Sequence, residues 1–546
     1  MQEFDVVVLG TGAAGLTAAI TAHEQGARVG IFEKSERVGG TTAWSGGQIW
    51  IPNNPHQIAA GKTDSREEAL TYLGALSHGL IPDDIAAAFV DSGAEMVRFL
   101  EERTPVRFYS VSEFPDYHPE LPGGKPEGGR TLECPPYPFG DLGAWKDRVE
   151  VSPYFPDYHI AVGETTLGQP VPVPMPPEER QRRIDNDERG LGHSVIGRLL
   201  RGCLDRGIAP ATGHRAVELV MEGGRVAGVV LETASGRTEV RAPNVILATG
   251  GFEWDADLVR AFLRGPMTHP VSVPTNTGDG LKMAMRAGAM LGNMREAWWA
   301  PVIEVPETLV SMKRQLISAG RTLPGTIIVN ADGKRFLNEA ANYNAAGAAF
   351  HEQDTATSSY RNLPAWVIFN QRFYDKYGFG GGLRTEYAAG ERAPDWIAYG
   401  ETLHALAERL GIPGDALAAT VERFNTMVRA GYDADFRRGE SAHDRWWGDP
   451  AFKGQKRGTL GPIKDGPYYA VELKCGALGT KGGPQTDADA RVVDLDGNVI
   501  EGLYAAGNVM ASPMGMTYGG AGGTLGPAMV FGYRAGRHAG RHNAVR

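Results

Sequence analysis

The fold of this chain is decided near its start, by the stretch Phe4-Asp5-Val6-Val7-Val8-Leu9-Gly10-Thr11-Gly12-Ala13-Ala14-Gly15. The first six residues are mostly apolar and β-branched and predict a buried strand, which runs directly into three glycines spaced G-x-G-x-x-G. Good helix formers fill residues 16–25, residues 28–32 predict a second strand, and Glu33 stands just after it. Strand, glycine turn, helix, strand and acid, in this order, form the βαβ unit that binds a dinucleotide.

The glycines of this motif have separate roles. Gly10 allows the tight turn, Gly12 lets a pyrophosphate approach the main chain beside Ala14, and Gly15 lets the helix pack closely on the strand. The phosphates are expected at the start of the helix, where unpaired N–H groups and the positive end of the helix dipole meet. Glu33, eighteen residues beyond Gly15, is expected to accept both hydroxyls of a ribose.

The bulk composition is that of an ordinary globular protein with more than one domain. The 546 residues are too many for one core, and 42% hydrophobic with 22% charged residues are typical proportions. The net charge of −10 argues against nucleic acid and against an anionic membrane surface as partners. No apolar stretch reaches eighteen residues, so no transmembrane segment is predicted, and the N-terminal apolar run is interpreted as a strand rather than a signal peptide.

The chain has only three cysteines, Cys134, Cys203 and Cys475, which lie far apart and form no C-x-x-C pair. This pattern argues against a redox dithiol and against a cysteine-ligated metal centre, so no metal is predicted. Cysteines without an evident pairing fit a reducing compartment, and we expect the protein in the cytoplasm.

A second run of glycines and hydroxyl side chains follows Glu33 at once. Residues 34–47 contain Lys34-Ser35-Glu36-Arg37-Val38-Gly39-Gly40-Thr41-Thr42 and then Ser45-Gly46-Gly47, a pattern that suits a long dinucleotide lying extended. The segment resembles the fumarate reductase/3-ketosteroid dehydrogenase group of FAD proteins, which carry "EK...GG.TA.SGG" at this point. The resemblance implies FAD rather than NAD. Because no histidine or cysteine lies between Gly39 and Gly47, where some relatives attach the flavin, we expect FAD to be bound non-covalently.

The resemblance covers essentially the whole chain and implies an α/β fold. We expect a Rossmann-like FAD-binding domain, split in sequence into residues 1–275 and 462–546, with a Pro/Gly-rich excursion at about 115–180 that has the character of a lid. Residues 276–461 are expected to form an inserted α+β domain that binds substrate and carries catalytic residues. Antiparallel strands are predicted within residues 216–248, and a glycine-rich start is predicted for the final helix.

The resemblance also implies further contacts with the cofactor. They lie in the segment after Glu33, by the adenine, on the strand that ends at residue 250, in a "TGDG" loop, and at the start of the final helix. These residues are Lys34, Gly40, Thr41, Thr42, Ser45, Gly46, Gly47, Ala216, Val217, Ala248, Thr249, Gly250, Asp279, Gly507, Asn508, Gly523, Thr524 and Leu525.

The group contains two chemistries, and the sequence distinguishes them. Fumarate-reducing members place an "HPT" segment after the helix that follows TGDG, because a dicarboxylate needs a histidine and cations. Here Trp298 and Trp299 stand at that point, and His269 precedes the TGDG loop and is out of position. The tryptophans are consistent either with core packing or with the lining of an apolar pocket. Both interpretations favour a neutral apolar ketone over a dicarboxylate.

The sequence is more similar to the 3-ketosteroid dehydrogenases, through three tyrosines. Tyr518 begins Tyr-Gly-Gly-Ala-Gly-Gly-Thr-Leu-Gly-Pro-Ala-Met, close to the family's Y-P-G-P-G-A-T-x-G-P-A-M. In that family the tyrosine hydroxyl and the N–H of the second glycine, here Gly522, bind the ketone oxygen. Tyr343 follows Asn-Glu as the family's second tyrosine does, and Tyr117 lies in a loop similar to "DY.PE.PGG". The resemblance implies that Tyr343 is the base and that Tyr117 either relays its proton or hydrogen-bonds to it.

The resemblance therefore implies desaturation of the bond α,β to a ketone. The proton leaves the α-carbon, the hydride goes to flavin N5, and two donors at the ketone oxygen stabilise the enolate charge. Gly519 and Ala521 replace the family's two prolines, so the ring system stays open: a 3-oxosteroid desaturated at C1–C2 or C4–C5, or a smaller cyclohexanone-type ketone. An external acceptor such as a quinone would reoxidise the flavin. The alternatives are an FAD-dependent enone or fumarate-type reductase and a flavoprotein that acts only as a carrier.

Overall fold

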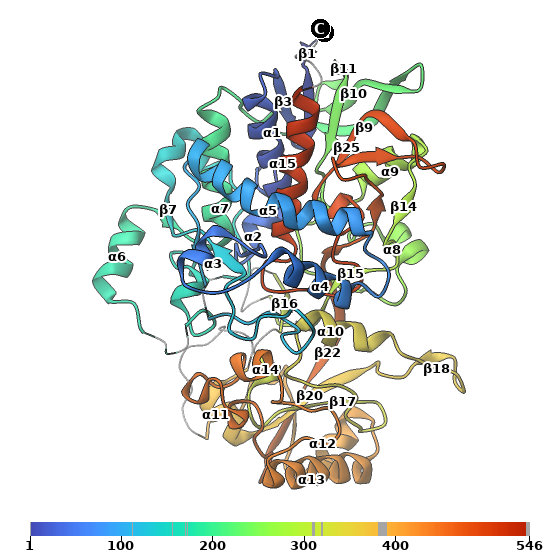
Figure 1. The fold of residues 1–546 in the computed structure, drawn as a ribbon. Helices are drawn as coiled ribbons and strands as arrows, with labels where there is room; N and C mark the ends of the chain where they lie inside the picture. Colours follow the sequence, from blue (N-terminus) through green and yellow to red (C-terminus); the bar gives the residue numbers. More distant parts are fainter. Residues whose placement is uncertain are drawn as a thin grey trace.

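A computed structural model describes residues 2–111, 113–155, 157–169, 171, 173–307, 312–317, 320–379 and 390–541. Two units make up the molecule (Figure 1), the dinucleotide unit with both ends of the chain and the inserted unit that carries helices α11 to α14. No helix among these residues is long and apolar enough to cross a membrane.

The dinucleotide unit is built on a five-stranded sheet whose order is β24-β25-β12-β2-β3. Its parallel strands are β2 (Val6–Leu9), β3 (Val29–Phe32), β12 (Asn244–Leu247) and β25 (Val499–Ala505), and β24 (Arg491–Val493) runs antiparallel at the edge. The strand and helix predicted at the start of the chain are present as β2 and α1 (Ala13–Glu24). Segments almost 500 residues apart in sequence thus share one sheet.

The first and last long helices lie side by side on one face of this sheet. Figure 1 shows α1 in blue against α15 (Leu525–Arg541) in red. Their contact is close because glycines face main chain: a Cβ added to Gly532 would lie 2.4 Å from the Ala14 carbonyl oxygen, and one on Gly536 would lie 2.3 Å from that of Ala18. Small residues at a helix crossing permit this approach, so the two helix starts reach the same edge of the sheet.

Other helices and a second sheet complete the dinucleotide unit. The predicted antiparallel strands are present as β9, β10 and β11, and β1 joins them in parallel beside β11 in the sheet β1-β11-β10-β9. Its strands are β1 (Gln2–Glu3), β9 (Arg215–Glu222), β10 (Arg225–Thr233) and β11 (Gly236–Arg241). The helices are α2 (Gly40–Trp44), α3 (Pro55–Ala59), α4 (Arg66–Ser77), α5 (Asp83–Arg103), α6 (Pro177–Asp185), α7 (Leu191–Leu204), α8 (Ala256–Phe262) and α9 (Asp279–Arg286).

Short strands connect the loops of both units in small sheets of two or three strands. They are β4 (Ile49–Trp50), β5 (Tyr109–Ser110), β6 (Thr131–Glu133), β7 (Tyr137–Pro138), β8 (Glu188–Arg189), β14 (Leu291–Gly292), β18 (Gln353–Asp354), β19 (Ser359–Tyr360) and β23 (Gly483–Pro484). The Pro/Gly-rich excursion from residue 115 includes β6 and β7 and the start of α6, and it packs over one side of the dinucleotide unit.

The inserted unit is built on a seven-stranded sheet. Its path is β16-β15-β22-β20-β17, and β13 and β21 also pair with β22. The strands are β13 (His269–Pro270), β15 (Ala297–Glu304), β16 (Arg314–Leu316), β17 (Ile327–Asn330), β20 (Ala365–Asn370), β21 (Ala398–Gly400) and β22 (Tyr468–Thr480). The helices are α10 (Tyr343–Ala348), α11 (Gln371–Tyr377), α12 (Leu403–Leu410), α13 (Gly414–Ala430) and α14 (Ala442–Trp446).

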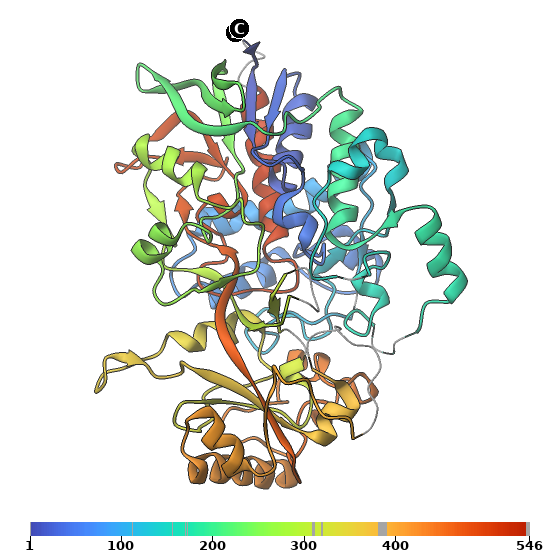
Figure 2. The same cartoon turned by 180° about the vertical axis from the view of Figure 1, so that it is seen from behind.

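The long strand β22 connects the two units. It runs as one extended orange-red strand from the inserted unit up to the dinucleotide unit (Figure 2), and its hydrogen bonds belong to the seven-stranded sheet. The boundaries of the inserted domain, expected at residues 276 and 462, therefore differ from the strand pairing and the helix packing, once at each boundary. Residues 468–480 pair in the inserted sheet, and α9, beyond residue 276, packs on β9 of the dinucleotide unit.

Candidate active site

A cavity of about 790 Å³ is lined by residues of both units. One end is formed by the glycine loops of the dinucleotide unit, and the other end is formed by three tyrosines and apolar side chains. All the cofactor residues predicted from the sequence line this cavity except Gly15, Val217 and Gly523. We call the end at the glycine loops the cofactor end and the end at the tyrosines the ketone end.

Two helices start at the cofactor end without an acidic residue in the first turn to neutralise the helix dipole. Gly12 is the N-cap of α1 and makes no side-chain cap, while the Ala13 N–H donates to Thr42 Oγ1 at 3.1 Å. Neither α1 nor α15 has an acidic residue in its first turn. Both helix starts line the cavity, so N–H groups and positive dipole ends are available to anionic groups. This donor set fits the pyrophosphate and the flavin of FAD.

Close main-chain packing explains two of the glycines. Gly10 has φ +106°, and a Cβ there would lie 2.3 Å from the Ala248 carbonyl oxygen. A Cβ on Gly15 would lie 2.1 Å from the Gly10 carbonyl oxygen. Gly15 therefore lies beneath the loop, which is why it does not line the cavity, and its contact is the helix–strand packing that its position in the motif predicts.

Glu33 lies at the cavity wall with its carboxylate partly satisfied by the protein. Oε2 accepts from the Thr11 N–H (3.0 Å) and from Thr11 Oγ1 (2.7 Å), and Oε1 accepts from the Ser35 N–H (2.9 Å). Desolvation raises the pKa of Glu33, and the hydrogen bonds from Ser35 and Thr11 oppose that shift. Since a carboxylate offers about four acceptor positions, Oε1 keeps capacity for a ribose hydroxyl.

Lys34 and Asp279 bind each other rather than facing the cavity separately. Lys34 Nζ lies 2.9 Å from Asp279 Oδ2 and 2.8 Å from Thr277 Oγ1, and Arg215 Nη2 lies 2.8 Å from Asp279 Oδ1. Burial raises the pKa of Asp279, but these two cations outweigh it and lower that pKa below its usual range. The pair joins β3 to α9 beside Ala216, at the end expected for the adenine. Val217 lines a separate cavity of about 760 Å³ instead.

Three tyrosines from distant segments meet at the ketone end. The rings of Tyr117 and Tyr343 lie 5.6 Å apart, those of Tyr117 and Tyr518 lie 5.1 Å apart, and those of Tyr343 and Tyr518 lie 5.4 Å apart. All three line the cavity. The predicted tyrosines are therefore brought together around one space.

The hydroxyls of Tyr117 and Tyr343 are linked by a hydrogen bond, and the hydroxyl of Tyr518 pairs with Thr524. Tyr117 Oη donates to Tyr343 Oη at 3.4 Å, and Tyr518 Oη lies 2.9 Å from Thr524 Oγ1. Burial raises the pKa of each tyrosine, and it raises that of Tyr343 well above the ordinary value. All three phenols are consequently protonated at neutral pH and can donate. A proton accepted by Tyr343 requires that its own proton moves to a neighbour.

Gly522 lies beside Tyr518 in the cavity lining, in a conformation that a larger residue would not adopt. Its φ is +93°, and a Cβ would lie 2.5 Å from the main chain at Gln48. Its carbonyl oxygen accepts from the Trp50 N–H at 3.1 Å, and among the described residues its own N–H has no hydrogen-bond acceptor. This N–H is thus available at the ketone end. Gly523 is turned away and packs beneath the Tyr518 ring.

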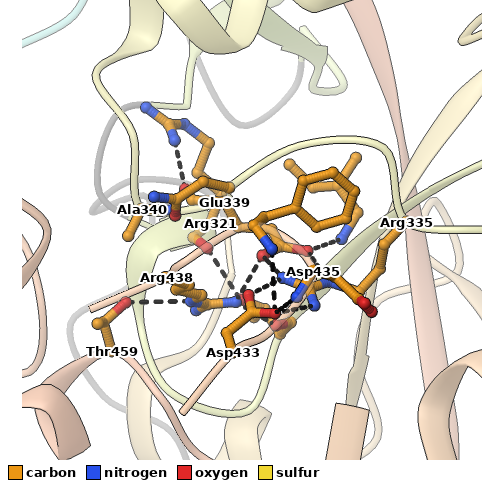
Figure 3. Close-up of polar contacts among 12 residues, drawn as sticks. Arg321, Arg335, Glu339, Ala340, Asp433, Asp435, Arg438 and Thr459 are labelled. Atoms are coloured by element: carbon orange, nitrogen blue, oxygen red, sulfur yellow. Dashed lines mark hydrogen bonds and ion pairs between the residues drawn. The ribbon is translucent and has the colours of Figure 1, made fainter. Parts of the chain in front are cut away.

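A buried cluster of charges holds the loop that carries Tyr343. In Figure 3, Arg335 and Arg438 converge on the Glu339 carboxylate, which lies 2.7 and 3.1 Å away, and the Arg321 guanidinium binds the Glu339 carbonyl oxygen. A second carboxylate also binds Arg335, with Asp433 Oδ2 2.7 Å from Arg335 Nη2. Four residues beyond Glu339, Tyr343 begins α10. The Asn-Glu pair before Tyr343 is therefore an anchor rather than a contact with the cavity.

The tryptophans that replace the fumarate reductase histidine are buried core residues and do not line the cavity. Trp298 lies behind Tyr518, with ring centroids 4.7 Å apart, and its Nε1 donates to Asn508 Oδ1 at 3.0 Å. Trp299 Nε1 donates to Glu296 Oε2 at 3.1 Å. His269 pairs with Glu304 at 3.0 Å, away from the cavity.

Most of the apolar wall of the ketone end carries no recognisable sequence motif. Its only signal was the Pro/Gly-rich excursion, which supplies residues 154–167, while the rest comes from segments without a motif. These lining residues are Tyr154, Phe155, Ile160, Val162, Leu167, Ile303, Leu316, Ile317, Leu323, Tyr377, Phe379 and Leu478.

Comparison with known proteins agrees with this geometry. Residues 5–525 match the FAD binding domain family. A 4-oxocyclohexanecarboxylate 2-dehydrogenase of Sinomonas cyclohexanicum is 41% identical, over 98% of this chain and 92% of that protein. A 3-oxosteroid 1-dehydrogenase of Mycobacterium tuberculosis is 38% identical over 98% of both chains. The crystal structure of 3-ketosteroid delta1-dehydrogenase from Sterolibacterium denitrificans, in complex with 1,4-androstadiene-3,17-dione, is 34% identical and superposes with a TM-score of 0.88 over 100% of both chains.

These findings confirm the predicted fold class and the predicted cofactor, FAD. The split α/β unit with an inserted α+β unit is the architecture that the sequence resemblance implied. The chain therefore belongs to the FAD binding domain family, in the branch of the 3-ketosteroid dehydrogenases, and is an FAD-dependent oxidoreductase of the type that acts on CH–CH groups.

Proposed function

We propose that this protein introduces a C=C bond α,β to a ring ketone, and that its substrate is a 3-oxosteroid desaturated at C1–C2. The observation that carries the proposal is the meeting of Tyr117, Tyr343 and Tyr518 at one end of the cavity whose other end fits FAD. The high identity to dehydrogenases of oxo compounds supports the same reaction.

The ketone oxygen is held by Tyr518 Oη and the Gly522 N–H. Both groups are donors at neutral pH, because burial keeps the phenol protonated and because the amide has no acceptor among the described residues. Two donors in a site shielded from water stabilise the negative charge that develops on the oxygen when the α-proton leaves. Thr524 Oγ1, 2.9 Å from Tyr518 Oη, keeps that hydroxyl in place.

Tyr343 takes the α-proton. Since burial raises its pKa far above neutrality, Tyr343 cannot act as a standing tyrosinate, so its own proton must leave as the α-proton arrives. That proton passes to Tyr117 Oη, which now donates to Tyr343 and must first turn its hydrogen away, and Tyr117 gives up its own proton to water in the same relay. When bound, FAD supplies the acceptor for the hydride from the β-carbon. The two hydrogens of the substrate thus leave as a proton and a hydride, and a double bond forms between the two carbons.

The lining of the ketone end favours a neutral, apolar substrate. Lys34 is the only lysine, and there is no arginine, among the described residues that line the cavity, and Asp279 already binds Lys34 at the adenine end. A second candidate, a 4-oxocyclohexanecarboxylate, is favoured by the 41% identity to a dehydrogenase of that compound. The steroid remains the first candidate, because a carboxylate finds no free cation in the described lining.

We also infer that an external acceptor such as a quinone reoxidises the flavin and that the protein works in the cytoplasm. The three cysteines support the second inference, because all of them are buried and unpaired. Unpaired thiols are typical of a reducing compartment.

Anaerobic mixing tests the proposed reaction. Holoenzyme is mixed with 4-androstene-3,17-dione, with 4-oxocyclohexanecarboxylate and with fumarate, while the visible absorption band of the flavin is followed. We expect rapid bleaching with the steroid, slower or no bleaching with the carboxylate, and none with fumarate. Bleaching by the carboxylate alone would establish the second candidate. Turnover of fumarate by the pre-reduced enzyme, without any response to ketones, would refute the proposed function.

A further inference from the structure

A lysine is fully buried directly behind the tyrosine that faces the ketone. Lys481 follows the end of β22, and none of its surface is exposed. Its Nζ lies 2.5 Å from the Thr517 carbonyl oxygen and 4.3 Å from the centre of the Trp298 ring. No carboxylate of a described residue lies within ion-pair distance of it. A buried ammonium without a counter-ion is costly, so a position that keeps one requires an explanation.

Both contacts of Lys481 lead directly to Tyr518. Thr517 directly precedes Tyr518 in the chain. The hydrogen bond from Lys481 to the Thr517 carbonyl oxygen therefore fixes the main chain next to Tyr518. Trp298 is the ring against which Tyr518 packs, at 4.7 Å and 65°. The same indole donates to Asn508, which lines the cofactor end of the cavity. Lys481 thus supports Tyr518 from two directions while remaining outside the cavity.

The surroundings of Lys481 make its charge sensitive to pH. Burial lowers the pKa of Lys481 to about 7, while Glu296 raises it and Arg264 lowers it. Glu296 Oε1 already pairs with Arg264 Nη1 at 3.4 Å, and its Oε2 accepts from Trp299, so little of its charge is left for the lysine. Lys481 therefore changes its charge within the neutral pH range. The three tyrosines stay protonated there, because their pKa values are raised.

We propose that Lys481 is a positioning residue for ketone activation, and that its ammonium form holds Tyr518 in the orientation that binds the enolate oxygen. The proposal rests on the proposed function. The charged form makes a stronger hydrogen bond to the Thr517 carbonyl than the neutral amine does, and only the charged form attracts the face of Trp298. Its positive charge also stabilises the negative charge that forms at Tyr518 when the α-proton leaves.

Exchange of the α-proton with solvent tests this proposal without net dehydrogenation. Holoenzyme whose flavin has been reduced with dithionite is incubated with 4-androstene-3,17-dione in deuterated buffers across the neutral range. Deuterium in the recovered ketone is measured by mass spectrometry. With the acceptor already reduced, the exchange rate reports Tyr343 and the Tyr518–Gly522 donors alone.

We expect the exchange rate of the wild type to fall as the lysine loses its proton, with an inflection near its pKa of about 7. Lys481→Met should lower the rate in the acidic half of the range by about tenfold, as expected for the loss of one desolvated cation–π contact. It should also remove the inflection. Lys481→Arg keeps a positive charge throughout, so it should restore much of the acidic rate and show no fall. Flavin content and circular dichroism report whether each variant has folded.

Lys453 provides a matched control. It is also largely buried, its Nζ lies 3.7 Å from the centre of the Trp446 ring, it binds main-chain carbonyls, and burial lowers its pKa to about 7. Its contacts, however, are with Thr166 and Gln169 of the excursion and not with Tyr518. Lys453→Met should therefore leave the pH dependence of exchange unchanged.

Three outcomes would overturn the proposal. They are a flat wild-type profile, an inflection that persists in Lys481→Met, and an inflection that disappears in Lys453→Met instead. The flat wild-type profile needs no variant, so the proposal stays testable if Lys481→Met does not fold. A wild type that neither exchanges nor oxidises any ketone would refute the proposed function as well. A wild type that oxidises the steroid with any of the three outcomes would refute only the role of Lys481.

Discussion

The two ends of the cavity are built in different ways. At the cofactor end, main-chain groups of glycine loops and helix starts form most of the lining, and they come in short runs of consecutive residues, each recognisable in the sequence. At the ketone end, side chains form the lining. The hydroxyls of Tyr117 and Tyr343 form a hydrogen bond there, although the two residues are separated by 226 positions in the chain. The cofactor end is therefore expected to tolerate side-chain changes well, and the ketone end to depend on single atoms.

The largest effect is expected from the base. Tyr343→Phe removes the only atom that accepts the α-proton and should lower flavin reduction by 3-oxosteroids by on the order of 10³-fold or more. Ketone binding, measured by perturbation of the flavin spectrum, should stay near the wild-type value. Tyr154→Phe is the matched control, because Tyr154 also lines the cavity but its hydroxyl contacts Met312 instead of the other tyrosines. Normal reduction rates in Tyr343→Phe would show that the base lies elsewhere, with Tyr117 next to be tested.

A smaller effect is expected from one of the two donors at the ketone oxygen. Tyr518→Phe leaves the Gly522 N–H in place and should lower kcat on the order of 10²–10³-fold, as does the loss of one oxyanion donor. Exchange of the α-proton should be slowed but not abolished, which distinguishes this variant from Tyr343→Phe. Steady-state kinetics with an artificial electron acceptor measure the loss. A change below tenfold would mean that the phenol does not hold the oxygen.

At the cofactor end, the effect of one side chain should be smaller still. Glu33→Ala should weaken FAD binding by about 1–3 kcal/mol through lost hydrogen bonds, because the main-chain contacts of the glycine loop remain. The dissociation constant follows from fluorescence titration of apoprotein with FAD. Glu36→Ala is the control, since Glu36 is exposed at the end of the same strand. Affinity equal to wild type in Glu33→Ala would place the ribose away from this carboxylate.

The smallest expected effect is a loss of folding stability at acid pH, to which one buried histidine in each region contributes. Burial lowers the pKa of His193, in the dinucleotide unit, to about 4, and it lowers the pKa of His443, which packs 5.0 Å from Tyr117. Above pH 6.5 both folded and unfolded chains hold neutral imidazoles. As pH falls below 6.5, the unfolded chain gains protons that the folded chain does not, so stability decreases toward pH 4. The loss should be on the order of 1–3 kcal/mol for His193.

Thermal unfolding between pH 8 and pH 4.5 measures this dependence. His193→Phe and His443→Phe should each flatten the curve of melting temperature against pH. A variant whose curve keeps the full wild-type slope would show that its histidine is protonated in the folded protein. If only His443→Phe flattens the curve, the ketone end alone is the acid-sensitive region.

The comparison of the two ends also shows how much of the site the sequence could reveal. The dinucleotide loop was evident from three glycines and an acid, because each glycine answers a local requirement such as the positive φ of Gly10. The tyrosines were found only through resemblance to a family, since one tyrosine among 18 carries no local signal. Lys481 had no signal at all, and the apolar wall of residues 154–167 had only the Pro/Gly-rich composition of its excursion. Their importance arises from what packs against them.

The sequence by itself determined the βαβ unit, because short-range periodicity and glycine spacing fix main-chain conformation locally, and its resemblance to a family implied the FAD cofactor and the split order of the units. Only the tertiary structure decided that β22 belongs to the inserted sheet, that Trp298 supports Tyr518 from behind, and that Glu339 anchors the loop of Tyr343. The pairing of β22 with β20, the packing of Trp298 on Tyr518 and the ion pair of Glu339 with Arg438 each join segments about a hundred or more residues apart. Packing of the whole chain, and not the preference of any short stretch, selects them.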